Sequence, residues 1–255
     1  MSNQMQLIEP YQHCDKCDNN GFIIKNGSAV RCECWIKYKE RLSLLKRMLD
    51  ANLLVEESSR EEVEKLISYS LKDYKGNDMS GNIPKIRKYI DKFEERFRSV
   101  NLFFTGTNGT QKSTLARYMV LELIRKGFSA YYIITKDFID IVMASERDEL
   151  KAEKLDRILK VDFLVLDEFS PDKIAMYNSG YKQSIITSPI KKRFETIRKA
   201  TIVISNKTLT ELKNSEMGMT LSDLIDRETK NGCQLTFTDN YGDYARIDLS
   251  SIWDN

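Results

Sequence analysis

The sequence lacks the features that would place a chain in a membrane or direct it to secretion. No apolar run approaches the roughly 18 residues that a membrane helix needs. The first twelve residues, MSNQMQLIEPYQ, contain no basic start followed by an apolar core, so no secretory signal is expected. Internal repeats and low-complexity tracts are also missing. We therefore expect a cytoplasmic protein without membrane contact.

The chain also lacks a strong charge of one sign. Its formal net charge is +2, so the overall charge does not indicate a nucleic-acid binder, and any such surface must come from local patches. Apolar residues make up 41% of the 255 residues and charged residues 31%. This mixture and length suit one α/β domain with a buried sheet and a small additional module.

Apolar segments of strand length alternate with helical segments after residue 98. Strands are expected over residues 101–105, 129–135, 162–168, 201–206, 234–238 and 245–249. Helices are expected over residues 113–127, 138–159, 188–199 and 221–230. This alternation predicts the α/β class, with a parallel sheet covered by helices.

The region before this alternation predicts a small module and a linker. Amphipathic helices are expected over residues 35–55, 61–71 and 83–98, with a break at DYKGNDMSGN. The first of these helices is basic. We therefore expect three parts: a metal-binding module with the basic helix in residues 1–55, a helical linker in 56–82, and the α/β domain in 83–255.

A phosphate-binding loop is predicted directly after the first strand of the α/β domain. The segment GTNGTQKST stands between that strand and a helix, which is the context of a Walker A loop. Backbone N–H groups and the positive end of the helix would hold the phosphates of ATP. Lys112 would place its ammonium on the β and γ phosphates, and the Ser113 hydroxyl would coordinate Mg²⁺. The candidate nucleotide-binding residues are Gly106, Thr107, Asn108, Gly109, Thr110, Gln111, Lys112, Ser113 and Thr114.

Gln111 departs from the Walker A pattern, which has glycine immediately before the lysine. A residue other than glycine costs about 1 kcal/mol if the loop requires a positive φ. The Gln111 side chain could also crowd the phosphates. ATP hydrolysis is therefore expected to be slow, and a loop that binds ATP without hydrolysing it is an open alternative.

Acidic residues follow a second apolar strand. The segment FLVLDE ends in Asp167 and Glu168, which would lie at the ligand crevice of an open α/β sheet. Asp167 would hold Mg²⁺ through water, and Glu168 would orient and activate the attacking water. Asn206 ends the strand TIVISN and could hydrogen-bond this water or the γ phosphate, although it could also only form a turn.

The cysteines predict a zinc site. Four of the five lie in two close pairs, Cys14 with Cys17 and Cys32 with Cys34. Four thiolates suit tetrahedral Zn²⁺, and the segment NNGFIIKNGS between the pairs predicts a hairpin that would bring them together. His13, the only histidine, could replace one thiolate, and buried free cysteines are the other alternative.

These motifs together resemble the DnaC/DnaI helicase loaders and the related IstB transposition ATPases, a branch of the AAA+ ATPases. The order GTNGTQKST, FLVLDE and TIVISNKTLTEL matches the family's Walker A, Walker B and sensor-1 segments. The resemblance implies an arginine-finger role for Arg227 in LIDRETKNG and a sensor-2-like role for Arg246 in FTDNYGDYAR. The cysteine cluster with its basic helix is similar to zinc-bearing loaders, including phage versions.

The resemblance implies an ATP-dependent loader of a replicative DNA helicase that binds single-stranded DNA and self-associates. A basic segment with interleaved aromatics suits single-stranded DNA, although a solvated helix face is its common alternative. This segment contains Tyr181, Lys182, Lys191, Lys192, Arg193, Phe194, Arg198 and Lys199, with Glu195 as its acid. Other functions left open are an IstB-type transposition regulator and a weakly hydrolysing adaptor. Arg227 could instead only form surface ion pairs.

Overall fold

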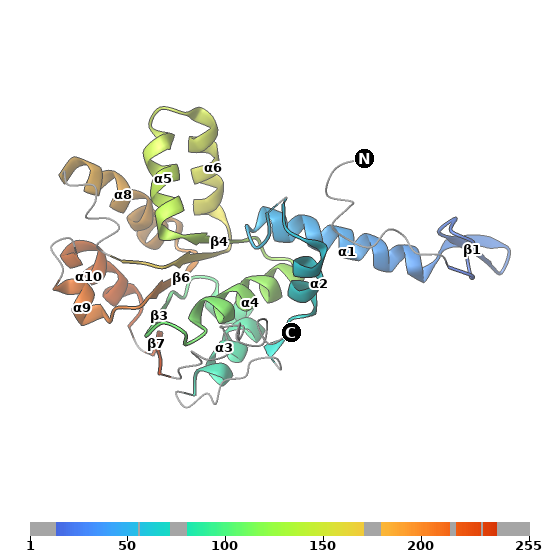
Figure 1. Cartoon of the computed structure of the whole chain (residues 1–255), viewed down its shortest axis with the longest axis horizontal. Coiled ribbons are helices and arrows are strands. Elements are labelled where there is room, and N and C mark those ends of the chain that lie inside the picture. The colour runs from blue at the N-terminus through green and yellow to red at the C-terminus, as the bar shows by residue number, and fades with distance from the viewer. Residues whose placement is uncertain are drawn as a thin grey trace, which may run out of the picture. The chain divides into compact units, whose positions relative to one another are not determined.

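The computed structural model describes residues 14–55, 57–71, 81–170, 180–214, 218–230 and 232–238. The chain divides into two compact units, residues 1–73 and 74–255, which are drawn in Figure 1. His13, Arg246 and the strand expected over residues 245–249 lie outside the described residues. Among the residues described, no helix combines the length and apolarity that crossing a membrane would take.

The first unit contains a β-hairpin followed by two helices. Strands β1 (Phe22–Lys25) and β2 (Ser28–Arg31) pair antiparallel, which confirms the predicted hairpin. Asn26 and Gly27 both have positive φ, of 50° and 76°, and residues that tolerate this conformation favour a two-residue hairpin turn. Helix α1 (Glu33–Asp50) follows the hairpin.

Three features order the helices of the first unit. Helix α1 buries Leu45 and Met48, which lie three residues apart on one face. Helix α2 (Arg60–Ser68) begins with a capping box, in which Ser59 and Glu62 each satisfy a backbone N–H of the other. An ion pair between Arg41 of α1 and Glu64 of α2 joins the two helices.

The second unit contains a five-stranded sheet in the order β4-β5-β6-β3-β7, and every neighbouring pair is parallel. The strands are β3 (Leu102–Gly106), β4 (Ala130–Ile134), β5 (Phe163–Asp167), β6 (Ala200–Ser205) and β7 (Gln234–Phe237). Strands β3, β5 and β6 are nearly continuous apolar runs, as expected when helices cover both faces of a sheet. The predicted α/β class with a parallel sheet is confirmed.

Helices cover both faces of this sheet (Figure 1). One face carries α3 (Asn82–Asp91), the π-helical turn η3 (Phe93–Phe97) and α4 (Lys112–Arg125). The other carries α5 (Thr135–Ser145), α6 (Glu149–Lys160), α8 (Gly180–Lys192) and the π-helical turn η4 (Arg193–Ile197). Helices α9 (Leu209–Lys213) and α10 (Gly218–Glu228) follow β6. An apolar cluster of buried side chains lies on the α5 face.

The single helix predicted over residues 138–159 is wrong, because two helices occupy this region. Helix α5 ends at Ser145, and α6 begins at Glu149. The Asp148 side chain accepts hydrogen bonds from the backbone N–H groups of Leu150 and Lys151, at 2.9 and 3.2 Å. Asp148 therefore caps a new helix, an arrangement that acidic residues favour over a position inside a helix.

Candidate nucleotide site and cysteine cluster

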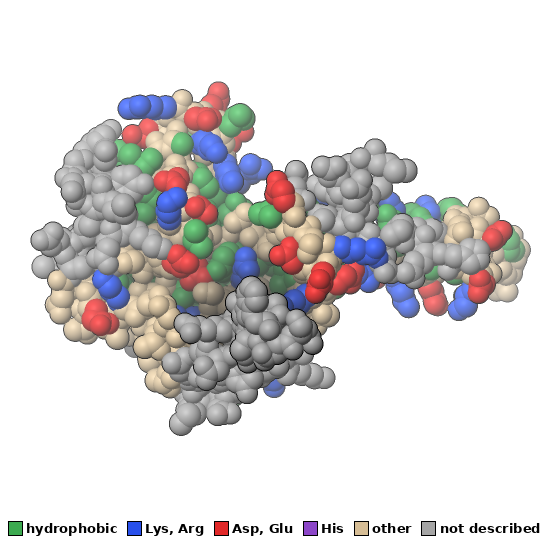
Figure 2. Space-filling model, viewed as in Figure 1, with side chains coloured by type: hydrophobic (Ala, Val, Ile, Leu, Met, Phe, Trp, Pro, Cys, Tyr) green, Lys and Arg blue, Asp and Glu red, His purple; other side chains and the backbone are tan. Residues whose placement is uncertain are grey.

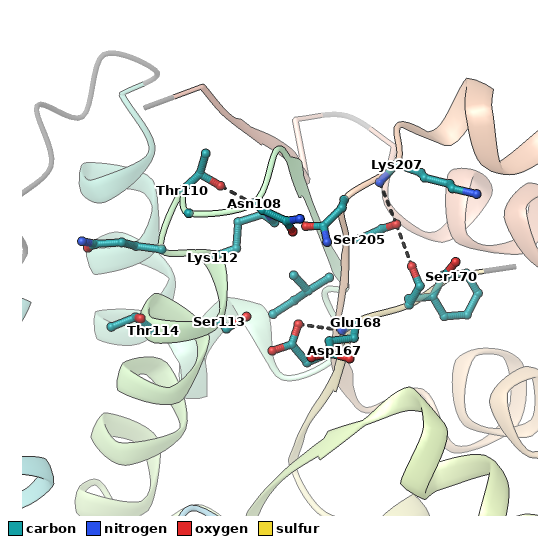
Figure 3. A pocket seen from close by; sticks show the side chains of 15 residues that line it. Asn108, Thr110, Lys112, Ser113, Thr114, Asp167, Glu168, Ser170, Ser205 and Lys207 are labelled. Carbon is teal, nitrogen blue, oxygen red and sulfur yellow. Dashed lines mark hydrogen bonds between the residues drawn. The ribbon is translucent and has the colours of Figure 1, made fainter. Parts of the chain in front are cut away.

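A cavity of about 700 Å³ opens at the carboxyl edge of the sheet (Figure 3). After β3 the chain next enters the sheet at β4, beyond β6 and β5, whereas after β6 it next enters at β7, on the other side of β3. The strand order therefore reverses beside β3. Open α/β sheets bind ligands at such a reversal, outside the carboxyl ends of the strands. Residues 108–114 form one side of this cavity, and residues 167–170 and 204–207, after β5 and along the end of β6, form the other.

Gly106 is the last residue of β3, and its surroundings explain why the loop needs glycine at this position. Its φ is 144°, and a Cβ atom at this position would lie 2.1 Å from the carbonyl oxygen of Phe237 on β7. Any side chain at Gly106 would therefore push β7 away from β3. Gly106 and Thr107 do not line the cavity, but their carbonyl oxygens face the lysine of the loop.

Lys112 is folded back into its own loop. Its Nζ donates to the carbonyl oxygens of Gly106 and Thr107, at 2.8 and 2.7 Å, and to Oγ1 of Thr110 at 3.0 Å. The side chain is 5% exposed, and burial lowers its pKa while the nearby Asp167 opposes this shift. These acceptors neutralise only part of the ammonium charge. An anionic ligand in the cavity would therefore be attracted to Lys112.

Gln111 adopts the left-handed conformation, with φ 58° and ψ 19°. The sequence had identified this position as one where the pattern requires glycine, and the backbone angles explain the requirement. A left-handed residue other than glycine costs about 1–2 kcal/mol. Glu168, across the cavity, also has a positive φ of 53°. Such strain concentrates at functional sites.

Asp167 is buried at the end of β5 and is held from several sides. Oδ1 accepts from the backbone N–H of Glu168 at 2.7 Å, and Oδ2 accepts from the hydroxyl of Tyr132 on β4. Thr135 donates its hydroxyl to the Asp167 carbonyl oxygen at 2.8 Å. Burial, followed by the charge of Asp167, raises the pKa of Tyr132 above its ordinary value, so the phenol stays protonated as a donor.

Glu168 is exposed to the cavity on a segment that β6 holds in place. The backbone N–H of Phe169 donates to the carbonyl of Ile204, and the Ser205 hydroxyl donates to the carbonyl of Phe169, both at 2.7 Å. The Phe169 ring is buried in the apolar cluster of the α5 face. Phe169 therefore anchors the backbone that presents Glu168.

The remaining predicted side chains fall in different places. Asn206 lines the cavity beside Ser205 and is exposed. Arg227 lines a separate cavity of about 350 Å³ between α8 and α10. There its guanidinium donates to Glu195 at 2.6 Å and to Glu228 at 3.2 Å. Of Asn206 and Arg227, only Asn206 faces the cavity that holds Lys112.

The predicted DNA-binding segment is wrong in its central residues. Arg193 and Phe194 are buried, because η4 turns them toward the sheet. Four hydrogen bonds connect the Arg193 guanidinium to the carbonyls of Leu159, Val161 and Ala200 and to the hydroxyl of Thr201. Acidic and basic side chains are interspersed over α5 and α6 on the face drawn in Figure 2.

The four cysteines of the first unit converge as the spacing predicts. Their Sγ atoms all lie within 4.8 Å of one another, with Cys14 and Cys32 at 3.8 Å and Cys17 and Cys34 at 3.5 Å. Four sulfurs about 2.3 Å from a central Zn²⁺ would lie about 3.8 Å apart in a tetrahedron. The backbone N–H groups of Cys17 and Asp18 both donate to the Cys14 carbonyl, which shapes the first pair into a tight turn. The donor set and its spacing therefore fit a zinc ion.

Sequence reasoning missed the residues that position the acids, namely Tyr132, Thr135, Phe169 and Ser205. Tyr132 lies on β4 and Thr135 on α5, whereas Asp167 lies on β5. No single motif predicts which strands are neighbours in a sheet. Phe169 directly follows the segment FLVLDE. Its apolar character was a usable signal of burial.

Comparisons with known proteins agree with this geometry. The replicative helicase loader DnaC of Escherichia coli strain K12 is 26% identical over 132 residues, which is 51% of this chain and 51% of that protein. The chain thus spans about half the length of the curated relatives it matches. Among solved structures, that of the DnaC helicase loader superposes with a TM-score of 0.54 and 20% identity, covering 68% of this chain and 99% of that one. The structure of DnaI gives 0.54 and 18%, covering 69% and 90%.

The structural likeness establishes the fold, the parallel α/β core that this chain shares with those two structures. A family model adds the sequence relationship, because the model described as IstB-like ATP binding protein matches residues 69–240. The match includes the loop around Lys112, the acids after β5 and the end of β6. More than half of the chain is therefore accounted for, and the chain belongs to the IstB-like ATP binding protein family.

Proposed function

We propose that this chain is an ATPase that, as an oligomer, loads a replicative DNA helicase onto single-stranded DNA. The observation that carries the proposal is the meeting of Lys112, Asp167 and Glu168 around one cavity. Phosphoryl transfer needs a cation for the phosphates, a carboxylate for the metal ion and a group that orients the nucleophile. The name of the DnaC relative supports the step from ATP binding to helicase loading.

In this proposal each side of the cavity has its own task. On ATP binding, the ammonium of Lys112 exchanges its loop acceptors for the β and γ phosphates. Ser113 would coordinate Mg²⁺ and Asp167 would hold it through water, since hydroxyl and carboxylate oxygens are groups that this ion accepts. Held there, Mg²⁺ would supply positive charge to offset the charge that develops on the transferred phosphoryl group. Glu168 orients the attacking water, and Asn206 is placed to hydrogen-bond the water or the γ phosphate. Arg246 is the proposed sensor-2 residue.

The catalytic assignment is tested with two variants that should fail differently. Lys112→Ala should lose ATP binding, whereas Glu168→Gln should keep it and lose turnover. Binding is measured by calorimetry with ATP and Mg²⁺, and turnover by phosphate release. Glu168→Gln with wild-type turnover would contradict the assignment. Wild-type protein that binds ATP without hydrolysing it would instead favour the adaptor alternative, which the left-handed Gln111 supports.

We propose that Cys14, Cys17, Cys32 and Cys34 bind one Zn²⁺ and that the module they order docks to the helicase. The first unit has a small apolar core, so a metal ion would supply much of its folding energy. Metal analysis of protein purified without chelators should return about one zinc per chain. Cys14→Ser combined with Cys17→Ser should remove it. Cys233→Ser is the matched control, because Cys233 lies in the second unit and should leave the zinc content unchanged.

A transposition regulator is the second candidate, and the description of the family model favours it. Both candidates share the ATPase core and differ in the protein they bind. Tagged chain should therefore be tested for co-purification with a replicative helicase and, separately, with a transposase. Capture of the helicase alone, lost in the Cys14→Ser and Cys17→Ser double variant, supports loading. Capture of the transposase alone would replace the loader proposal.

The loader proposal includes binding of single-stranded DNA, on a smaller basic surface of the protein than the sequence suggested. Lys191 and Lys192, at the end of α8, are exposed and precede the buried Arg193. Lys191 lies 3.9 Å from Glu195, which offsets part of its charge. Charge reversal of Lys192 should weaken binding of a fluorescent oligonucleotide if this helix end contacts the backbone phosphates. Unchanged binding would place the DNA elsewhere.

A further inference from the structure

The hydroxyl of Tyr132 lies between the two side chains proposed to hold magnesium. Tyr132 is on β4 and is 7% exposed. Its hydroxyl donates to Oδ2 of Asp167, and the Ser113 side chain, in the first turn of α4, lies close to it. Figure 3 shows Ser113 beside Asp167. The phenol therefore links one metal-binding group from the phosphate loop with the other from β5.

Both oxygens of the Asp167 carboxylate are thus held by donors. Oδ1 has the backbone N–H of Glu168, and Oδ2 has Tyr132. The Tyr132 ring is itself fixed, because the guanidinium of Arg117 lies over it, 4.9 Å from the ring centroid. A carboxylate held this way has one orientation before any ion arrives.

We propose that Tyr132 is a positioning residue for the magnesium-binding groups of the nucleotide site. The inference rests on the proposed ATPase function and deepens it. Tyr132 is not among the residues that line the cavity, so its hydroxyl acts through Asp167 and Ser113. Groups that orient the ligands of a metal ion typically contribute about 10–100-fold to metal affinity or activity.

The neighbouring Tyr131 provides a matched control on the same strand. Successive strand residues point to opposite faces, and Tyr131 packs against the apolar cluster on the α5 face. Tyr131→Phe therefore removes a hydroxyl from β4 without changing the surroundings of Asp167. Tyr132→Phe keeps the ring, the volume and the stacking partner of Arg117, and it removes only the hydrogen-bonding oxygen.

The test measures ADP binding as a function of Mg²⁺ concentration, and again in EDTA. Tyr132→Phe should need about 10–100-fold more Mg²⁺ than wild type for half-maximal tightening of ADP binding. Its affinity for ADP in EDTA, and the whole behaviour of Tyr131→Phe, should match wild type. As a second measurement, electron paramagnetic resonance with Mn²⁺ in place of Mg²⁺ should show weaker ion binding by the ADP complex of Tyr132→Phe.

Two results overturn the inference. One is a Mg²⁺ dependence in Tyr132→Phe equal to that of wild type. The other is an equal loss of ADP affinity with and without Mg²⁺, which indicates a general structural role; thermal unfolding of each variant identifies a folding defect. Wild-type protein whose ADP binding does not respond to Mg²⁺ would defeat the proposed function itself, and the inference with it. Failure of the inference alone requires a Mg²⁺-dependent wild type.

Discussion

Two buried cations lie at opposite edges of the same sheet. Lys112 contacts carbonyls at the carboxyl end of β3, and Arg193 contacts the carbonyls of Val161, just before β5, and Ala200, at the amino end of β6. They are 5% and 1% exposed, and both donate mainly to backbone oxygens. Burial lowers the pKa of both, to about 9 for Arg193, with Tyr89 and Asp162 opposing the shift there.

The two cations differ in whether a cavity adjoins them. Lys112 lines the cavity of about 700 Å³, whereas Arg193 lines neither of the two cavities described. The Arg193 guanidinium makes four hydrogen bonds in a fixed fork, and a planar five-donor group suits several carbonyls at once. The Lys112 side chain has several rotatable bonds, and the cavity adjoins it. A buried cation thus indicates a ligand site only where a cavity adjoins it.

Arg227 extends the comparison to an exposed cation. Its side chain is 56% exposed and is paired with carboxylates of its own chain, Glu195 and Glu228. We expect it to complete the ATP site of a neighbouring subunit, so Arg227→Ala should lower turnover about 10³–10⁵-fold, the effect of well-characterised arginine fingers. This is the largest effect expected on catalysis.

Mixing inactive proteins tests whether Arg227 acts between subunits. Arg227→Ala and Glu168→Gln, shown by light scattering to co-assemble, should together recover part of the ATPase activity, because some interfaces then hold both intact groups. Glu195→Gln is the matched control, since it removes the partner within the chain and leaves the arginine. An ion pair with only a structural role predicts that Arg227→Ala keeps full turnover.

The second prediction separates the two edges directly. Arg193→Met should lower the free energy of unfolding by several kcal/mol, because it leaves buried carbonyls without donors, at about 1–3 kcal/mol each. Lys112→Met should change it by no more than about 1 kcal/mol, because water can reach the loop carbonyls through the cavity. Urea unfolding measures both.

Nucleotide binding gives the opposite ranking. Lys112→Met should lose ATP binding, while Arg193→Lys, which keeps a cation at the amino edge, should bind ATP as wild type does once folded. Loss of ATP binding in folded Arg193→Lys, or a Lys112→Met protein that unfolds like Arg193→Met, would break the distinction between the edges.

The sequence predicted the carboxyl edge far better than the amino edge. Lys112, Asp167 and Glu168 belong to motifs in which residue type, spacing and the adjoining strand agree. Arg193 was assigned to a surface because its neighbours Lys191 and Lys192 are basic. The spacing of Ile186, Ile190 and Phe194 does mark a buried face, and Arg193 lies three residues after Ile190, on that same face.

No sequence motif could predict the contacts between segments that are distant in the chain. The hydrogen bond from Tyr132 to Asp167 depends on β4 and β5 being neighbours, and the anchoring of Phe169 depends on β6. The break between α5 and α6 was also missed, because the helical spacing of apolar residues continues past Asp148. The Asp148 side chain was the signal for the break, since it caps α6 and is unfavourable inside a helix. The alternation of strands and helices, by contrast, is a local property and was predicted.

The smallest expected effect comes from backbone strain, which occurs at both the carboxyl and the amino edge of the sheet. Gln111 at the carboxyl edge and Arg198 at the amino edge both have left-handed backbones, with φ of 58° and 54°. Replacing either by glycine relieves about 1–2 kcal/mol of strain. Glycine's larger entropy in the unfolded chain offsets about 0.5–1 kcal/mol of this gain. Gln111→Gly and Arg198→Gly should therefore each raise the free energy of unfolding by up to about 1 kcal/mol.

Only one of these two substitutions should alter function. Gln111 lines the nucleotide cavity, so Gln111→Gly should change ATP turnover, with an increase expected if the side chain crowds the phosphates. Arg198 follows η4 and precedes β6, far along the chain from the phosphate loop, so Arg198→Gly should leave turnover unchanged. Urea unfolding and phosphate release measure the two effects separately. Equal turnover in all three proteins would mean that Gln111 contributes strain without a catalytic consequence, and that the slow hydrolysis predicted from its presence is wrong.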